Sequence, residues 1–143
     1  CKIILPIDLV TASSMKNAKD TIKSSLKDVN DEHLVLDIGP DSCNALKNHF
    51  SEIKTVFWNG PLGAFEYKPF DHSTKDIAQH LAMAAKNSGL TVVVGGGDTI
   101  AALRNINVLD KYTHVSTSGG AFFEFLEGKI LPGIKALEEN SFT

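Results

Sequence analysis

The sequence contains little cysteine and no long apolar run. Cys1 and Cys43 are its only cysteines, without a CxxC pair or a Cys/His cluster at zinc spacing. This argues against a disulfide framework or a structural zinc and indicates a reducing compartment. No stretch approaches the ~20 apolar residues that span a bilayer, and no basic-then-apolar signal segment opens the chain. We therefore expect a cytoplasmic protein with no membrane partner.

An excess of basic residues is also missing. The net charge is -3 at pH 7, whereas a nucleic-acid partner usually leaves a basic stripe, so we expect no such partner. Neither a P-loop, GxxxxGK[ST], nor a dinucleotide fingerprint, GxGxxG, is present. With 43% hydrophobic and 22% charged residues, the chain is typical of one globular domain. It opens with Cys1 and Lys2 directly before an apolar run, which suggests a piece of a longer protein.

Short apolar runs alternate with helical patterns along the chain. Continuous apolar runs are typical of strands buried on both faces of a parallel sheet. The pattern therefore predicts an α/β fold, a doubly wound (Rossmann-like), mostly parallel sheet with flanking helices. The expected strands are residues 3–9, 34–37, 54–58, 90–94 and 114–116, and the expected helices are 74–88, 99–104, 121–127 and one that begins at Asp41 and Ser42. Residues 11–30 are ambiguous, with a thin apolar stripe that fits an amphipathic helix.

Two of the expected strands end in clustered glycine. Residues 91–94 lead into Gly95, Gly96 and Gly97, and residues 113–117 lead through Ser118 into Gly119 and Gly120. Glycine allows a phosphate to approach the backbone, and a helix start offers unpaired N–H groups, so the pair predicts a phosphate site. A plain strand-to-helix turn is the alternative for each loop alone.

Asp98 and Thr99 follow the first glycine cluster. Asp98 could cap the helix that begins there, or it could hold Mg²⁺, which takes one or two carboxylates with phosphate oxygens and waters. Thr99 could donate its hydroxyl or its backbone N–H to a phosphate. The residues by themselves leave both roles of Asp98 open.

A third motif, residues 57–66, leaves a strand and contains Trp58, Asn59, Pro61 and Glu66. It could be a rigid turn whose aromatic residues fill the core. It also suits a nucleoside, with flat surfaces for the base and a carboxylate for the ribose hydroxyls. Phosphoryl transfer needs cations around the moving group, yet neither glycine loop contains lysine or arginine, so a kinase would need basic residues from elsewhere.

The motifs resemble, in the same order, segments of the phosphoglycerate kinase family. The resemblance runs over residues 2–137 and is carried by Leu5-Pro6-Ile7-Asp8, Leu36-Asp37-Ile38-Gly39-Pro40, Trp58-Asn59-Gly60-Pro61 with Phe65-Glu66, Gly95-Gly96-Gly97-Asp98-Thr99, His114-Val115-Ser116-Thr117 with Gly119-Gly120-Ala121, and Phe125-Leu126-Glu127-Gly128-Lys129 with Leu131-Pro132-Gly133. It implies an incomplete C-terminal lobe. Residues 1–133 would be the later part of the nucleotide-binding lobe, and residues 134–143 a tail that packs on an N-terminal lobe and is loose without it.

The resemblance also implies the roles of individual residues. Asn59 and Pro61 would border ADP or ATP, Glu66 would bind the ribose, and Asp98 would hold Mg²⁺. Gly95, Gly96, Gly97 and Thr99 would meet the phosphates, while Gly96, Gly119 and Gly120 would stabilise the moving phosphoryl group. The intact enzyme, expected to be a monomer, would transfer phosphate between 1,3-bisphosphoglycerate and ADP, or between ATP and 3-phosphoglycerate in reverse. This chain alone would be inactive.

The sequence departs from the family at a few positions. Ser118 stands where the family usually has glycine and would be strained if that position needed a positive φ. Ser73 replaces a glycine that we expect before Thr74. The family also favours extended structure over residues 21–26. The alternative to a kinase is a protein of another functional class, a non-catalytic α/β module that binds a nucleotide or phosphate.

Overall fold

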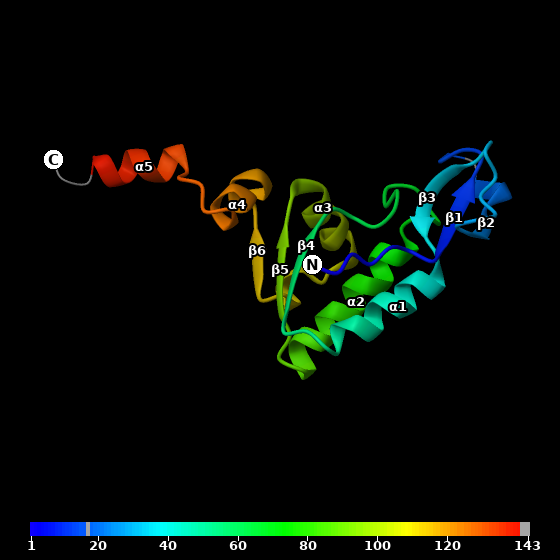
Figure 1. Ribbon diagram of the computed structural model, residues 1–143, viewed down its shortest axis with the longest axis horizontal. Helices are drawn as coiled ribbons and strands as arrows, with labels where there is room; N and C mark the ends of the chain where they lie inside the picture. The colour runs from blue at the N-terminus through cyan, green and yellow to red at the C-terminus, as the bar shows by residue number, and fades with distance from the viewer. Residues whose placement is uncertain (17, 141–143) are drawn as a thin grey trace.

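The structure is a computed structural model that describes residues 1–16 and 18–140. Two small β-sheets lie side by side with helices between them, and two further helices lead away from the second sheet (Figure 1). The elements are β1 (Asp8–Ala12), β2 (Ile22–Ser25), β3 (Leu34–Ile38), α1 (Pro40–Phe50), β4 (Thr55–Asn59), α2 (His72–Asn87), β5 (Thr91–Gly95), α3 (Gly97–Ile106), β6 (His114–Ser116), α4 (Gly119–Leu126) and α5 (Pro132–Glu139), with short 3₁₀ turns at Ala18–Asp20 and Leu109–Lys111.

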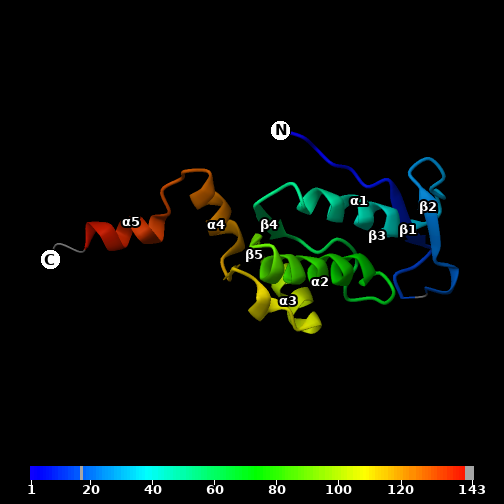
Figure 2. The same ribbon diagram turned by 90° about the horizontal axis from the view of Figure 1, so that it is seen from below.

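A parallel sheet in the order β4-β5-β6 forms the centre of the fold. Its strands are joined by α2 and α3, and α1 and α2 lie on one side of the sheet while α4 lies on the other (Figure 2). Alternate strand residues, Trp58, Val92 and Val94, enter a core with the inner faces of α1, α2 and α3. The predicted α/β class, with a parallel sheet and flanking helices, is therefore confirmed.

The remaining strands form a separate antiparallel sheet in the order β2-β1-β3. The prediction that residues 34–37 belong to the parallel sheet is wrong, because β3 pairs with β1 and not with β4. The prediction of a strand at residues 3–9 is wrong in position: the strand begins at Asp8, and residues 3–7 are extended past α1 without a strand partner among the described residues. The family's preference for extended structure over residues 21–26 is confirmed by β2, and the helical interpretation of that segment is wrong.

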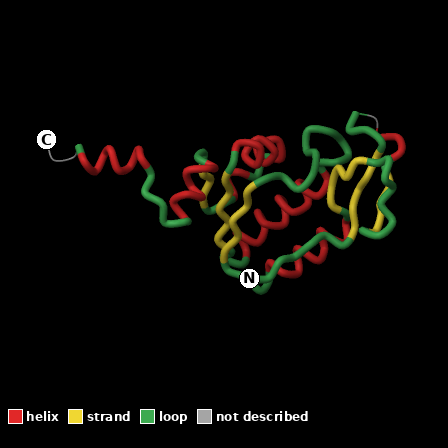
Figure 3. Tube along the Cα trace, turned by 45° about the horizontal axis from the view of Figure 1, so that its top comes forward, coloured by secondary structure: helices red, strands yellow, loops and turns green. Residues whose placement is uncertain are grey.

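The predicted helices are present, with longer bounds at their starts. Asp71 precedes the first residue of α2, which therefore begins two residues before the predicted start at residue 74. The expected loose tail forms α5, whose residues are exposed and which extends away from the rest of the chain (Figure 3). Residues 141–143 of that tail lie outside the described residues. Among the described residues, no helix combines the length and apolar character needed to cross a bilayer.

Candidate nucleotide and phosphate site

Three loops leave the parallel sheet from one row of residues. Asn59 is aligned with Gly95, and Gly95 with Ser116. Because the three strands run in the same direction, the loops that follow them emerge side by side at the carboxyl edge of the sheet, where open α/β sheets bind their ligands. The register therefore brings together the third motif and both glycine loops.

The two glycine loops touch each other. A Cβ added to Gly119 would lie 3.0 Å from the Cα and 3.3 Å from the backbone N of Gly96, so a larger residue would press on the Gly96 backbone. Gly96 has a φ of 90° and lies against the side-chain oxygen of Asn59, which also leaves no room for a side chain. The expected convergence of the loops is therefore what the structure has.

Two helix starts face this contact without side-chain caps. Gly96 precedes α3 and Ser118 precedes α4, and neither helix has a side-chain hydrogen bond at its N-terminus. Unpaired N–H groups and the positive end of the helix dipole make such starts binding sites for anions. Two of them in contact can hold one polyphosphate or a phosphoryl group between its donor and acceptor.

Asp98 lies in the first turn of α3 with its side chain exposed. Because α3 has no side-chain cap, the structure does not give Asp98 the capping role that the sequence left open. No group of three or more His, Cys, Asp or Glu side chains gathers anywhere in residues 1–16 and 18–140 to hold a metal. A lone exposed carboxylate beside two uncapped helix starts fits Mg²⁺, which would complete its coordination with oxygens of a bound phosphate and with waters.

Thr99 is a structural residue as well as a candidate ligand. It is buried, and its hydroxyl accepts a hydrogen bond of 2.6 Å from the backbone N–H of Gly60. The indole N–H of Trp58 donates to the Gly60 carbonyl over 2.6 Å. These bonds tie the start of the loop after β4 to α3, so Asn59 and Pro61 are fixed next to the first glycine loop.

Glu66 lies further along the same loop and lines a different space. It borders a cavity of about 310 Å³ with Lys68, Asp71, Lys75 and α3 residues such as Asn105, and none of the candidate glycines lines this cavity. The structure therefore groups Asn59, Asp98, Thr99 and the glycines at the sheet edge, while Glu66 lies apart from them at this second cavity.

Ser118 is not strained in the position where the family has glycine. Its φ is -107° and its ψ is 85°, a backbone conformation that any residue adopts. The hydroxyl of Ser116 accepts a hydrogen bond of 3.3 Å from the Ser118 N–H. The strain that a positive φ would have caused is absent.

Basic side chains are distant from the glycine loops in the described sequence. Arg104 is in the last turn of α3, and Lys111 belongs to the 3₁₀ turn that precedes β6. Two other lysines are already paired, Lys47 with Asp76 and Lys75 with Asp71. What the glycine loops themselves offer an anion is backbone N–H groups and not basic side chains.

Sequence reasoning treated residues 37–40 as a turn and missed the importance of Asp37. Asp37 is 3% exposed, and burial raises the pKa of its carboxyl group even though Ser73 donates hydrogen bonds to it. No local pattern signals this role, because the partner of Asp37 is Ser73, 36 residues away in the first turn of α2.

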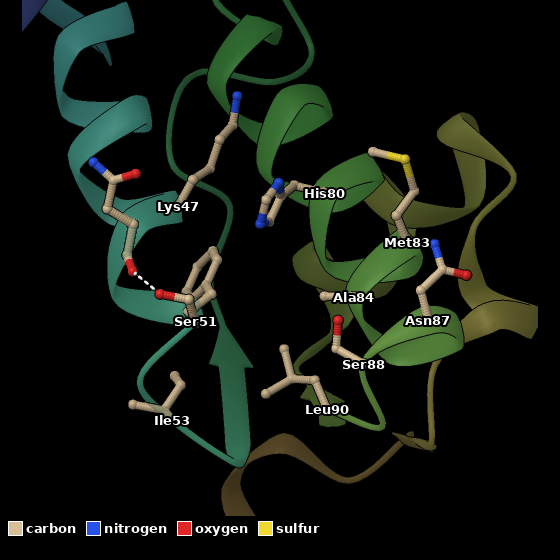
Figure 4. A pocket seen from close by; sticks show the side chains of 11 residues that line it. Lys47, Ser51, Ile53, His80, Met83, Ala84, Asn87, Ser88 and Leu90 are labelled. Atoms are coloured by element: carbon tan, nitrogen blue, oxygen red, sulfur yellow. Dashed lines mark hydrogen bonds between the residues drawn. The ribbon is translucent and has the colours of Figure 1, made fainter.

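A larger cavity lies at the other end of the sheet. It measures about 580 Å³ and is formed by the last turns of α1 and α2 together with the residues that precede β4 and β5. Lys47, His80, Met83 and Asn87 surround it (Figure 4). None of the candidate site residues lines it, so the glycine loops and not this cavity define the site.

The sequence matches the family model of phosphoglycerate kinase over residues 1–129. The chain belongs to the phosphoglycerate kinase family. Curated phosphoglycerate kinases from Granulibacter bethesdensis and Caulobacter vibrioides are 45% and 46% identical to it, and each alignment covers 96% of this chain. The solved structure of phosphoglycerate kinase from Coxiella burnetii superposes on 96% of this chain with a TM-score of 0.85 and 38% identity.

The chain spans about a third of its relatives. It covers 35% of the two curated sequences and 34% of the Coxiella burnetii structure. The phosphoglycerate kinase from Pyrococcus horikoshii superposes with a TM-score of 0.75 and 26% identity, over 93% of this chain and 32% of that one. The fold is thus a part of the fold of these kinases.

Proposed function

We propose that this chain supplies most of the Mg-nucleotide site of a phosphoglycerate kinase. The reaction is phosphoryl transfer between 1,3-bisphosphoglycerate and ADP, or between ATP and 3-phosphoglycerate in reverse. The observation that carries the proposal is the backbone contact between Gly96 and Gly119, since it places two uncapped helix starts at one point beside an exposed carboxylate.

Each candidate residue has a role in this proposal. The N–H groups at the start of α3, around Gly95, Gly96, Gly97 and Thr99, bind the nucleotide phosphates, and those at Gly96, Gly119 and Gly120 stabilise the moving phosphoryl group as negative charge shifts onto its oxygens. Asn59 and Pro61 border the nucleotide, and Glu66 accepts hydrogen bonds from the ribose. Asp98 would hold Mg²⁺, whose chemistry is to neutralise phosphate charge.

We further propose that residues 1–133 are the later part of a nucleotide-binding lobe and that residues 134–143 pack on another lobe of a monomeric, cytoplasmic enzyme. Three observations support this. The parallel sheet has three strands, fewer than a typical sheet. The described glycine loops carry no basic side chain, and α5 is exposed along its length. The missing cations lead us to expect no turnover from the 143 residues alone.

Binding of Mg-ADP tests the site. We expect Asp98→Asn in the protein at its natural length to weaken Mg-ADP about tenfold or more, while binding of ADP without Mg²⁺ changes little, because the lost group is the metal ligand. Asp110→Asn is the matched control, since Asp110 is also an exposed carboxylate at a helix start. Calorimetric titration with both forms of ADP measures the difference, and equal losses in Asp98→Asn and Asp110→Asn would contradict the assignment.

A coupled assay of turnover separates the kinase from a non-catalytic nucleotide-binding module. If the protein is a kinase, we expect the natural protein to turn over 3-phosphoglycerate and ATP. We expect no turnover by the isolated 143 residues. Nucleotide binding without turnover by the natural protein would favour the module. Turnover by the 143 residues alone at the rate of the natural protein would contradict the proposed need for further cations.

A further inference from the structure

The loop between β4 and α2, residues 60–71, contains Pro61 and Glu66 but has no regular secondary structure. Backbone hydrogen bonds within the loop, from the Phe65 N–H to the Gly63 carbonyl and from the Tyr67 N–H to the Ala64 carbonyl, shape it locally. Its place on the molecule depends on contacts with the surrounding elements. The contacts that attach the loop to the rest of the protein therefore set the position of Glu66.

Buried hydroxyl groups hold the first half of this loop. The hydroxyl of Thr74, in the first turn of α2, accepts a hydrogen bond of 3.1 Å from the Leu62 N–H. The carbonyl of Leu36 on β3 accepts a hydrogen bond of 2.8 Å from the Ala64 N–H. Thr74 is 1% exposed, so water cannot readily replace its hydroxyl as the acceptor.

The carboxylate of Asp37 links these anchors to one another. It accepts hydrogen bonds from the N–H of Ser73, over 3.1 Å, and from the Ser73 hydroxyl, next to Thr74. It also lies directly against Gly63 of the loop, where an added Cβ would come within 2.5 Å of the Asp37 Cγ. The start of α2, the end of β3 and the middle of the loop are thus joined at one buried carboxyl group.

Apolar contacts hold the second half of the loop to the same place. Phe70 is fully buried and packs with Ala12 of β1 and Leu36 of β3, and Ala64 lies against this cluster. The loop is therefore attached to the antiparallel sheet as well as to α2. Glu66 projects from a segment with a buried anchor on either side of it.

We infer that Asp37, Ser73 and Thr74 are positioning residues that set the affinity of the site for its nucleotide by holding the loop that carries Glu66. This inference rests on the function proposed above. The three side chains are buried and bonded to the protein itself. Thr74 also borders the cavity of Glu66, but its hydroxyl is engaged by the Leu62 N–H, so we assign all three an action through the loop. Their loss raises KM for the nucleotide and leaves kcat and KM for the phosphoglycerate nearly unchanged.

Thr74→Val in the natural protein is the test. Valine has the shape of threonine but leaves the Leu62 N–H without an acceptor, so we expect KM for Mg-ATP to rise about fivefold to tenfold and kcat to change less than about twofold. Thr74→Ser restores the acceptor and returns KM toward the wild-type value. Faster amide hydrogen exchange in residues 60–71 accompanies the rise.

Thr11→Val is the matched control. Thr11 is 0% exposed, and its hydroxyl bonds to Nδ1 of His33 over 3.3 Å, within the antiparallel sheet and away from the loop. A general loss of stability would affect both variants, whereas a positioning role affects KM for the nucleotide only in Thr74→Val. Ser73→Ala, which removes one hydrogen bond to Asp37, is a second variant that we expect to raise the same KM about threefold to fivefold.

The outcomes separate this inference from the proposed function. If Thr74→Val and Ser73→Ala turn over substrate as the wild type does and keep its KM for the nucleotide, the positioning role is wrong. The proposed kinase function still stands in that case. Equal KM changes in Thr74→Val and Thr11→Val also overturn it. A wild-type protein that neither binds nor turns over nucleotide overturns the proposed function and this inference with it.

Discussion

The two sheets of this molecule are stabilised in different ways. The parallel sheet shares with α1, α2 and α3 a core of twelve buried residues, whereas the antiparallel sheet has a cluster of three: Ala12, Leu36 and Phe70. Hydrogen bonds to two carboxyl groups hold this half of the molecule in addition to its small apolar cluster. Asp8 on β1 and Asp37 next to the end of β3 accept hydrogen bonds from the first turns of α1 and α2. The half of the molecule with less core thus depends more on a few polar groups.

The largest effect should follow from Phe70→Ala. Phe70 is the largest side chain of the small cluster, so we expect the variant to lower the free energy of unfolding by about 4 kcal/mol, against about 3 kcal/mol for Leu103→Ala in the large core. Chemical denaturation measures both values. A smaller loss for Phe70→Ala than for Leu103→Ala would break the comparison, since it would mean that the small cluster is the better able to repack.

Alkaline pH should lower the free energy of unfolding through Cys43, which lies in the large core. Burial raises the pKa of this thiol from 9.0 to about 11, so the unfolded chain loses the proton first. Stability is then complete below pH 9 and falls as the pH rises toward 11, by about 2–3 kcal/mol in all. Urea denaturation across this range should show a shallower decline for Cys43→Ala than for the wild type, and identical declines would contradict the assignment.

Acid should lower the free energy of unfolding through Asp8, which lies on β1 of the antiparallel sheet. Burial raises the pKa of its carboxyl, but hydrogen bonds from the Ser42 hydroxyl and from the N–H groups of Ser42 and Asp41 outweigh burial, so the pKa lies below 3.8. The stabilisation is present above pH 3.8 and is lost as the pH falls through the lowered value.

We accordingly expect Asp8→Asn to cost about 1–2 kcal/mol at pH 7 and to reduce the loss of stability between pH 5 and pH 2. Denaturation curves at several pH values measure both effects. Asp28→Asn is the control, because Asp28 is exposed and lies outside α1. If the control flattens the acid profile as much as Asp8→Asn does, the cap on α1 is not the cause.

The smallest effect should follow from Ser118→Gly at the start of α4. Ser118 has a negative φ and no side-chain cap to lose, so restoring the family's glycine should change the free energy of unfolding by only a few tenths of a kcal/mol. Thermal denaturation measures it. A gain of stability above about 1 kcal/mol would mean that serine is strained there after all.

Much of the parallel half could be predicted from the sequence. Continuous runs such as residues 91–94 indicated buried parallel strands, and glycine clusters marked the points where α3 and α4 begin. Both signals are local, because they depend on side chains a few residues apart. The candidate residues Asn59, Asp98 and Thr99 could be found in the same way, by their place directly after a strand.

The antiparallel half could not be predicted as well. Apolar runs at residues 3–7 and 34–37 look alike in sequence, yet within the described part of the chain the first has no strand partner, while the second pairs with β1. Strand partners are chosen across the fold, and periodicity does not encode the choice. Asp37 was missed for the same reason, since its partner Ser73 is 36 residues away.

The amino-acid sequence by itself determined the element types, the family and the places where backbone N–H groups are left unpaired, because propensity, glycine and motif order are properties of short segments. Only the tertiary structure decided that Gly96 touches Gly119, that β1 and β3 form a sheet of their own with β2, and that Asp37 lies against Gly63 in the loop of Glu66. Those facts are distances between segments far apart in the chain. They exist only once the core has packed and fixed the strands in register.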